Sequence, residues 1–312
     1  FLFERPSIGS WILYGLGTKN RDLPGFVTVK PPVILGGARN YGNAFLPSVY
    51  QGTPIGTMSK ALKTAAIANT KHPTLSREQQ RKQLDFLQSL NRDFARQQKS
   101  SDQVEGVIES FELAFRMQTG LPSLMDLSSE TQTTLDAYGI GDKLKTDDFG
   151  RQCLLARKLA ENDVRFIELT HDNWDHHGFV SRLMPQKSFE IDQPMAALLT
   201  DLKQRGLLED TLVVWGGEFG RTPDDPRGDG RGHQPEGFTM WMAGGGVKPG
   251  MIHGATDEYG YKAVKGRVHV HDLHATILHL LGLDHTQLTY RYAGRDFRLT
   301  DVYGRVVSEI LA

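Results

Sequence analysis

The chain has 312 residues, of which 39% are hydrophobic and 23% are charged, a balance typical of soluble globular proteins. Its formal net charge of -1 supplies no long-range field that would favour nucleic acid or a membrane surface. No apolar run approaches the roughly 20 residues of a membrane span, so we expect neither a nucleic-acid partner nor a membrane-spanning segment.

The first 56 residues are rich in glycine and proline. A short helix is expected between Pro6 and Gly17, and residues 26–29 are predicted to form a short strand. The glycine-rich segment 36–42 is expected to be a loop. It does not have the pattern of a phosphate-binding loop, because no Gly-Lys-Ser or Gly-Lys-Thr follows it.

Residues 76–162 are predicted to form a helical region, beginning with Ser76 and Gln79 at the spacing of a capping box. The first helix carries an apolar stripe at helical spacing, which we expect to lie in the core. The stripe consists of Leu84, Leu87 and Leu90, with Phe86 and Phe94 nearby. Further helices are expected at 102–119, 128–138 and 149–161. Cys153, in the last of them, is expected to be a small buried apolar residue.

From residue 164 onward the pattern changes to strands alternating with helices. Strands are expected at 164–170, 211–215 and 238–243, and helices at 188–205, 272–281 and 302–311. The strand at 211–215 is nearly all apolar, as in a parallel sheet that is covered on both faces. The alternation predicts an α/β fold with a doubly wound, mostly parallel sheet and flanking helices. We expect one domain over residues 1–312, with 76–162 as a helical insertion.

Ten of the eleven histidines lie between His171 and His285. Most of these ten fall in three clusters, at 171–177, 231–233 and 269–274. Imidazole nitrogens and carboxylate oxygens at short spacing are the ligands that a divalent transition metal needs. The clustering therefore predicts metal-assisted chemistry in the C-terminal half of the chain.

The predicted strands indicate where these side chains meet. In an open α/β sheet, ligands bind outside the carboxyl ends of the strands. The first histidine cluster follows one strand, Glu218 follows the next, and His233 joins them if its loop folds back to the same edge. We expect one divalent ion to be held by His171, Asp175, His177 and His233. Glu218 is expected to be a further ligand or an acceptor for Arg221.

The neighbouring polar residues have less specific patterns. His176 and His177 are adjacent, so only one of them is expected to bind the metal, and Asp172 suits a turn as well as a ligand. Arg221 and Arg231 are suited to holding a tetrahedral oxyanion. We expect Asp272 to be a helix N-cap. Residues expected to support the ligands are His269, His271 and His274, and those expected to be structural are His253, His279 and His285.

Four segments together resemble a large, planctomycete-type, sulfatase-like bacterial family that is a domain of unknown function. These segments are 170–178, 213–222, 230–235 and 268–276. The family is similar to the alkaline-phosphatase/sulfatase superfamily, and the resemblance covers essentially the whole chain. It implies an alkaline-phosphatase-like sheet and a metal site at the carboxyl edge of that sheet. Phe219 stands where the superfamily has a histidine, and the superfamily's N-terminal nucleophile segment is expected to be missing from the chain.

The resemblance implies a metal-dependent hydrolase of phosphate or sulfate esters, either small molecules or polysaccharides. Zn²⁺ is the expected ion, with Ca²⁺, Mn²⁺ and Mg²⁺ as alternatives. Glu218, Arg221 and Arg231 would be the catalytic residues. A periplasmic or secreted location is implied by the family, although we do not expect a signal peptide within residues 1–312. Two alternatives stay open: a non-catalytic protein that binds anionic polysaccharide, and a phosphosugar mutase.

Overall fold

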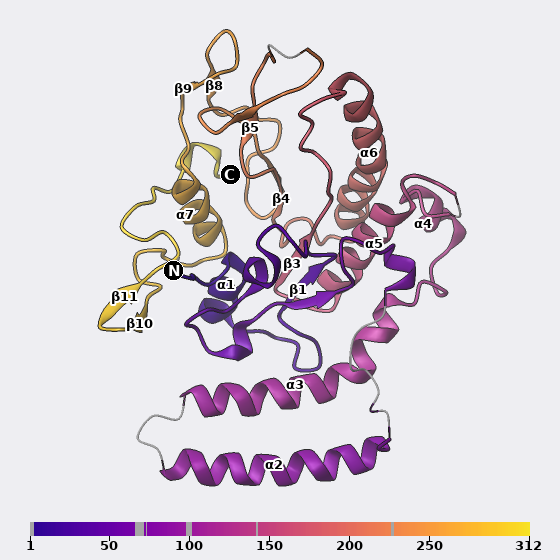
Figure 1. The fold of residues 1–312 in the computed structure, drawn as a ribbon, viewed down its shortest axis with the longest axis vertical. Coiled ribbons are helices and arrows are strands. Elements are labelled where there is room, and N and C mark those ends of the chain that lie inside the picture. The colour runs from indigo at the N-terminus through magenta and orange to yellow at the C-terminus, as the bar shows by residue number, and fades with distance from the viewer. Residues whose placement is uncertain (1–2, 66–71, 73, 98–101, 142, 226–227) are drawn as a thin grey trace. The chain divides into compact units, whose positions relative to one another are not determined.

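The structure is a computed structural model that describes residues 3–65, 72, 74–97, 102–141, 143–225 and 228–312 (Figure 1). The chain divides into two compact units by its internal contacts. One unit comprises Phe1–Gln132 and Leu154–Thr170, and the other comprises Thr133–Cys153 and His171–Ala312. The single domain that we expected over 1–312 stays a prediction.

The first unit contains a small parallel sheet with strand order β2-β1-β3. Its strands are β1 (Phe26–Val29), β2 (Thr53–Ile55) and β3 (Phe166–Leu169). In its register, Val27 of β1 lies opposite Thr53 of β2 and Ile167 of β3. The strand predicted at 26–29 is confirmed, and it is buried along its whole length because it is the central strand. The buried core beside the sheet contains Leu23, Val27, Val29, Ile55, Leu62, Leu121, Leu155, Leu159 and Val164.

Helix α1 (Ile8–Leu16) confirms the short helix predicted at the start of the chain. Ser7 is its N-cap, and the Ser7 hydroxyl accepts a hydrogen bond from the Ser10 amide. A Cβ atom at Gly9 would overlap the rings of Phe26 and Phe166, so α1 lies close to the sheet. Three short 3-10 helices complete this part of the unit: η1 (Gly37–Tyr41), η2 (Ser48–Tyr50) and η3 (Leu62–Thr64).

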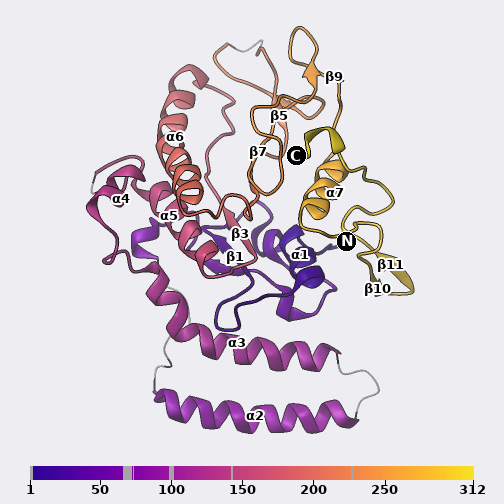
Figure 2. The same ribbon diagram turned by 180° about the vertical axis from the view of Figure 1, so that it is seen from behind.

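Helices α2 (Arg77–Gln97) and α3 (Asp102–Met125) lie side by side in both views (Figures 1 and 2). The capping box predicted at Ser76 and Gln79 is confirmed, with both reciprocal hydrogen bonds present. The end predicted for α3 at residue 119 was wrong, since the helix continues through Pro122. Leu121 is fully buried in the core of the unit, so tertiary packing outweighs the break that proline favours.

The apolar stripe of α2 is mostly exposed, contrary to our prediction. Leu84 is buried, and Gln88 on the same side donates a hydrogen bond to the carbonyl oxygen of Ile108 in α3 at 2.8 Å. The exposed members are Phe86, Leu87, Leu90 and Phe94. Helical spacing identifies an apolar stripe, but it does not specify which side of the helix meets a neighbour.

A partly buried carboxyl group, that of Glu168, is expected to give the first unit a pH-dependent stability. Burial raises the pKa of Glu168, in β3, to about 7. An unfolded glutamate titrates near pH ~4.3, so the folded state holds the proton more tightly and the free energy of unfolding falls as pH rises from about 4 to about 7. We expect Glu168→Gln to raise the free energy of unfolding by about 2–3 kcal/mol at about pH 8 and to change it little at about pH 4. Urea unfolding at both pH values measures this, and an equal difference at the two would contradict it.

The helices of the second part of the chain are α4 (Gln132–Ala137), α5 (Asp147–Glu161), α6 (Val180–Gln204) and α7 (Val270–Leu280). Helix α6 begins earlier than predicted and contains Pro185 and Pro194. The N-cap of α7 is His269, so the N-cap predicted at Asp272 was wrong. Asp272 is the N3 residue of the capping box, and its side chain accepts a hydrogen bond from the His269 amide. The tail predicted as a helix contains only the 3-10 helix η4 (Ser308–Ile310).

The described residues of the second unit form four two-stranded antiparallel sheets. They pair β4 (Val213–Trp215) with β7 (Trp241–Ala243), β5 (Gly220–Arg221) with β6 (His233–Gln234), β8 (Ala255–Thr256) with β9 (Ala263–Lys265), and β10 (Tyr290–Tyr292) with β11 (Arg295–Phe297). The parallel pairing and complete burial that we predicted for 211–215 were wrong. Val214 and Trp215 are exposed, because within the described residues β4 pairs with β7 alone.

The described part of the chain therefore has mixed helices and strands, with one small parallel sheet of three strands. In the described part of the chain, no helix combines the length and the apolar character that crossing a membrane requires.

Candidate metal centre

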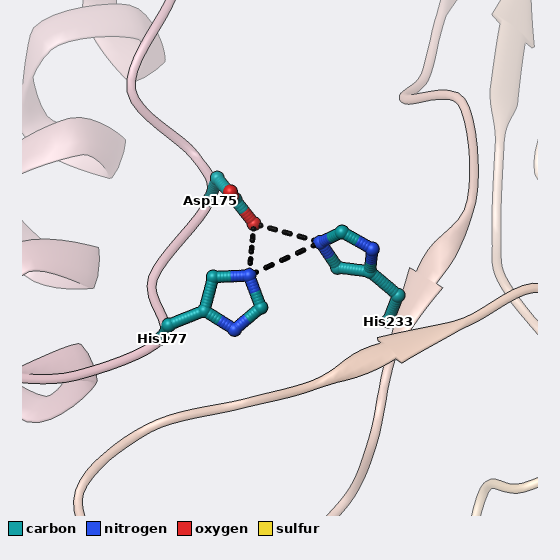
Figure 3. Close-up of side chains that lie close together, drawn as sticks. All are labelled: Asp175, His177 and His233. Atoms are coloured by element: carbon teal, nitrogen blue, oxygen red, sulfur yellow. Dashed lines mark hydrogen bonds and ion pairs between the residues drawn. The ribbon is translucent and has the colours of Figure 1, made fainter.

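Three ligand atoms converge in the second unit. Asp175 and His177 lie in the loop between β3 and α6, and His233 lies in β6 (Figure 3). The Oδ1 atom of Asp175 is 3.0 Å from Nε2 of His177 and 3.0 Å from Nε2 of His233. The two imidazole Nε2 atoms are 3.2 Å apart. All three residues are among the four ligands that we predicted from the sequence.

The register of a short ribbon positions His233. Arg221 of β5 lies opposite His233 of β6, and the Arg221 guanidinium donates a hydrogen bond to Oδ1 of Asp175. The Phe219 ring contacts the His233 ring, with centroids 4.5 Å apart, and the Arg221 guanidinium lies over the same Phe219 ring. Two residues separated by 58 positions in the chain, Asp175 and His233, are thereby held in contact.

Backbone contacts fix the loop that carries Asp175 and His177. The Arg231 amide donates to the His176 carbonyl oxygen at 2.9 Å, and the Val180 amide donates to the Asp229 carbonyl oxygen at 3.1 Å. The Ser181 hydroxyl donates to the carboxylate of Asp229 at 2.6 Å. The ligand loop is therefore attached to the segment that leads into β6 at more than one point.

Hydrogen bonds and charges keep Asp175 ionised. The pKa of Asp175 is lowered to about 2, first by the hydrogen bond from Arg221 and then by the hydrogen bond from His233. The positive charge of Arg221 lowers it further. The group thus presents an anionic oxygen beside two imidazole nitrogens.

The donor set and the spacing are compatible with a divalent ion. Zn²⁺ in proteins is bound by histidine nitrogen and carboxylate oxygen at about 2.0–2.2 Å, which places two ligands of a tetrahedral ion about 3.3 Å apart. The three separations here are 3.0, 3.0 and 3.2 Å. Among the described residues, this is the one group of three or more potential ligands that converges. An ion held by these three residues alone would have an open coordination position, as in catalytic zinc sites.

His171, the fourth predicted ligand, lies in a different cluster. Its Nδ1 accepts a hydrogen bond from the indole N–H of Trp174 at 2.9 Å. An indole N–H can only donate, so the ring proton of neutral His171 resides on Nε2, which is 3.1 Å from Oε2 of Glu190. Lys187 pairs with the same Glu190 oxygen at 2.8 Å. Burial lowers the pKa of His171, with a further contribution from Lys187. Both nitrogens are therefore occupied, and the ring ties the ligand loop to α6.

We expect His171→Ala to keep one bound ion per chain and to weaken its affinity by about 10–100-fold, the effect typical of a residue that orients ligands. Titration of the metal-free variant with Zn²⁺ measures both quantities. Loss of the ion at saturating zinc would instead identify His171 as a ligand. The variant Glu190→Gln serves as a control, because it keeps an acceptor oxygen for the His171 N–H while removing the charge.

The structure places the other predicted residues outside the converging group. Glu218 is exposed, and it is not one of the three converging ligands. Arg231 donates to the adjacent carbonyl oxygen of Gly230, while Arg221 contacts Asp175. Of the residues expected to support the ligands, His269 caps α7 and stacks on His271, and burial lowers the pKa of His274 to about 4.

Two residues of the site were not recognised from the sequence. Gly230 approaches the ligand loop so closely that a Cβ atom there would overlap the His177 carbonyl oxygen. Asp229 binds Ser181 through its side chain and Val180 through its carbonyl oxygen. The available signal was their position directly before Arg231, Gly232 and His233, but the close approach depends on a second segment of the chain.

Comparison with known proteins identifies the family. The chain belongs to the family described as "Protein of unknown function (DUF1501)", whose match covers residues 2–311. No curated protein and no solved structure matches the chain. The family assignment thus spans almost the whole chain, and the function has to be inferred from the site.

Proposed function

We propose that this protein is a metal-dependent hydrolase of phosphate or sulfate esters. The observation that carries the proposal is the convergence of one carboxylate oxygen and two imidazole nitrogens, from Asp175, His177 and His233, within 4.8 Å of one another. An exposed site with three protein ligands suits catalysis better than a structural role, since structural zinc sites are usually closed by a fourth protein ligand.

Asp175, His177 and His233 would hold the ion, and Zn²⁺ fits this donor set best. When bound there, a divalent ion would supply Lewis-acid polarisation of an ester oxygen and a water activated as a nucleophile near neutral pH. Arg221 uses Nη1 to hold Asp175, and its remaining N–H groups are available to the non-bridging oxygens of a phosphate or sulfate. Arg221 would thus both orient a ligand and stabilise negative charge in the transition state.

We also propose that the fold is of the alkaline-phosphatase type, with the three parallel strands of the first unit as part of its sheet. Supporting features are the similarity of segments 170–178, 213–222, 230–235 and 268–276 to that superfamily and the position of Asp175 and His177 after β3. A loop that follows the carboxyl end of a parallel strand is the usual place for a ligand in α/β proteins.

A second candidate function is supported by the surroundings of the site. Phe219 packs against His233, and Glu218 is outside the converging group, so the further ligand that we expected at Glu218 does not lie with the other three. A protein that binds anionic polysaccharide without hydrolysing it would need the cation and Arg221 but no nucleophile.

Hydrolysis assays distinguish the two functions. Purified protein is first stripped of metal and analysed for metal content, then assayed with an aryl phosphate and an aryl sulfate after addition of Zn²⁺, Mn²⁺ or Ca²⁺. Turnover of either ester that depends on added metal supports the hydrolase. Stoichiometric metal binding without turnover of either ester supports the binding protein, and failure to bind any of the three ions would contradict both.

A further inference from the structure

Two tryptophans form an exposed pair in the second unit. Trp215 of β4 lies directly opposite Trp241 of β7 in the antiparallel register. Their ring centroids are 6.3 Å apart, and the ring planes are inclined by only 17°. Trp215 is 39% exposed, and Trp241 is partly exposed. Tryptophan is a large side chain that is highly buried on average, so two of them at the surface of a two-stranded sheet call for an explanation.

The pair belongs to the β4–β7 sheet, which is next along the chain to the β5–β6 sheet that carries His233 of the candidate metal centre. The chain runs from β4 into β5 and returns from β6 into β7. The β4–β7 pair therefore directly flanks the β5–β6 pair in the sequence. Only six positions separate Trp215 from Arg221, a reach of at most about 20 Å even for an extended backbone. Trp215 is therefore close enough to Arg221 for one short oligosaccharide to reach both.

The two segments that connect the β4–β7 pair to the β5–β6 pair are closely packed. A Cβ atom at Gly216 would overlap the Met240 side chain, and one at Gly220 would overlap the Gly237 carbonyl oxygen and crowd Phe238. These contacts join residues 216–220 to residues 237–240, between the tryptophan pair and the site. A ligand bound to the tryptophans would thus be held in a defined direction relative to Arg221 and His233.

The chemistry of this surface matches a sugar ring. Because side chains alternate along a strand, the face that carries the tryptophans also carries Val213 and Ala243, which have no polar side-chain atoms. A pyranose stacks its axial C–H groups on an indole face and keeps its hydroxyl groups in water, so it needs no polar partners on the platform. A nucleobase also stacks on indole, so titration with a nucleoside monophosphate is needed to distinguish the two.

We propose that Trp215 and Trp241 form a stacking platform for a sugar ring, and that the ester substrate is a sulfated or phosphorylated saccharide. The proposal rests on the proposed hydrolase function and names its substrate class. The platform would bind an unmodified ring of the saccharide, while Arg221 and the metal ligands receive the charged ester group.

Equilibrium binding tests this without requiring turnover. A sulfated oligosaccharide and its unsulfated counterpart are titrated by calorimetry into the zinc-loaded protein and into Trp215→Ala, Trp241→Ala and Tyr259→Ala. Tyr259 is an exposed aromatic residue in the turn between β8 and β9, and it serves as the matched control. Trp215→Phe keeps an aromatic face, and unchanged zinc stoichiometry shows that each variant retains its site.

The expected result is that each tryptophan-to-alanine change weakens binding of both oligosaccharides by about tenfold or more, in line with the stacking energy of one ring. Tyr259→Ala is expected to bind like the wild type, and Trp215→Phe is expected to recover part of the loss. Equal binding by the wild type and the alanine variants would overturn the proposal. Tighter binding of a nucleoside monophosphate that is lost in the same variants would overturn the saccharide assignment.

Failure of the platform and failure of the hydrolase are separable. Metal-dependent turnover of aryl esters with no saccharide binding would overturn the platform and leave the hydrolase intact. Saccharide binding that depends on the tryptophans, without turnover of any ester, would overturn the hydrolase and support the platform as part of a binding protein.

Discussion

Replacing His233 with alanine is expected to remove the bound ion and abolish metal-dependent ester hydrolysis. His233 supplies one of three converging ligand atoms, and its ring also donates to Asp175 and packs on Phe219. Loss of a residue that only orients a ligand costs about 10–100-fold in metal affinity, so loss of a ligand itself should cost more than 100-fold. His177→Ala is expected to have the same effect, and the double variant should retain no zinc after dialysis.

The measurement is metal content per chain after equilibration with Zn²⁺, together with hydrolysis of the better aryl ester. His279→Ala is the matched control, because His279 is an exposed histidine in the last turn of α7 and is not among the converging ligands. If the double variant bound zinc with the stoichiometry of the wild type, the metal centre would have to lie elsewhere.

Gly230→Ala is expected to disrupt the site without changing any ligand. A Cβ atom at position 230 would overlap the carbonyl oxygen of His177. The backbone amides of Gly230 and His177 each donate a hydrogen bond, so neither segment is free to move aside. The ligand loop must move to accept the methyl group. We expect zinc affinity to fall by about 10–100-fold, and overpacking of this kind typically lowers the free energy of unfolding by about 1–3 kcal/mol.

Gly232→Ala provides a control two residues away. A Cβ atom there would be 3.4 Å from the Thr222 methyl group, an ordinary contact distance, and neither glycine has the positive φ that disfavours alanine. Zinc titration and urea unfolding of both variants measure the difference. Equal affinities in the two variants would show that the close approach at Gly230 does not position the ligand loop.

Local sequence patterns predicted the elements whose cause is local. The capping box at Ser76, the helix after Ser7 and the strand at 26–29 all depend on residues within a few positions of one another. The patterns failed where a distant contact decides. Helix α3 passes through Pro122 because Leu121 is buried in the core, and β4 is exposed because its pairing partner is a single antiparallel strand.

The candidate site shows the same division. The sequence alone indicated that His171, Asp175, His177 and His233 have the chemistry of metal ligands, because residue type and spacing are visible in the chain. It did not distinguish His171 from the others, since the indole of Trp174 and the carboxylate of Glu190 occupy both of its nitrogens only after α6 packs beside the loop.

Residue chemistry and local periodicity were thus determined by the sequence: a mixed helical and stranded chain with metal-ligand residues concentrated in its C-terminal half. The tertiary structure alone decided which three of them converge, that Arg221 pairs with Asp175, and that two tryptophans share one exposed face. The physical reason is that these contacts join residues far apart in the chain, and such pairings depend on strand register and packing that no local pattern specifies.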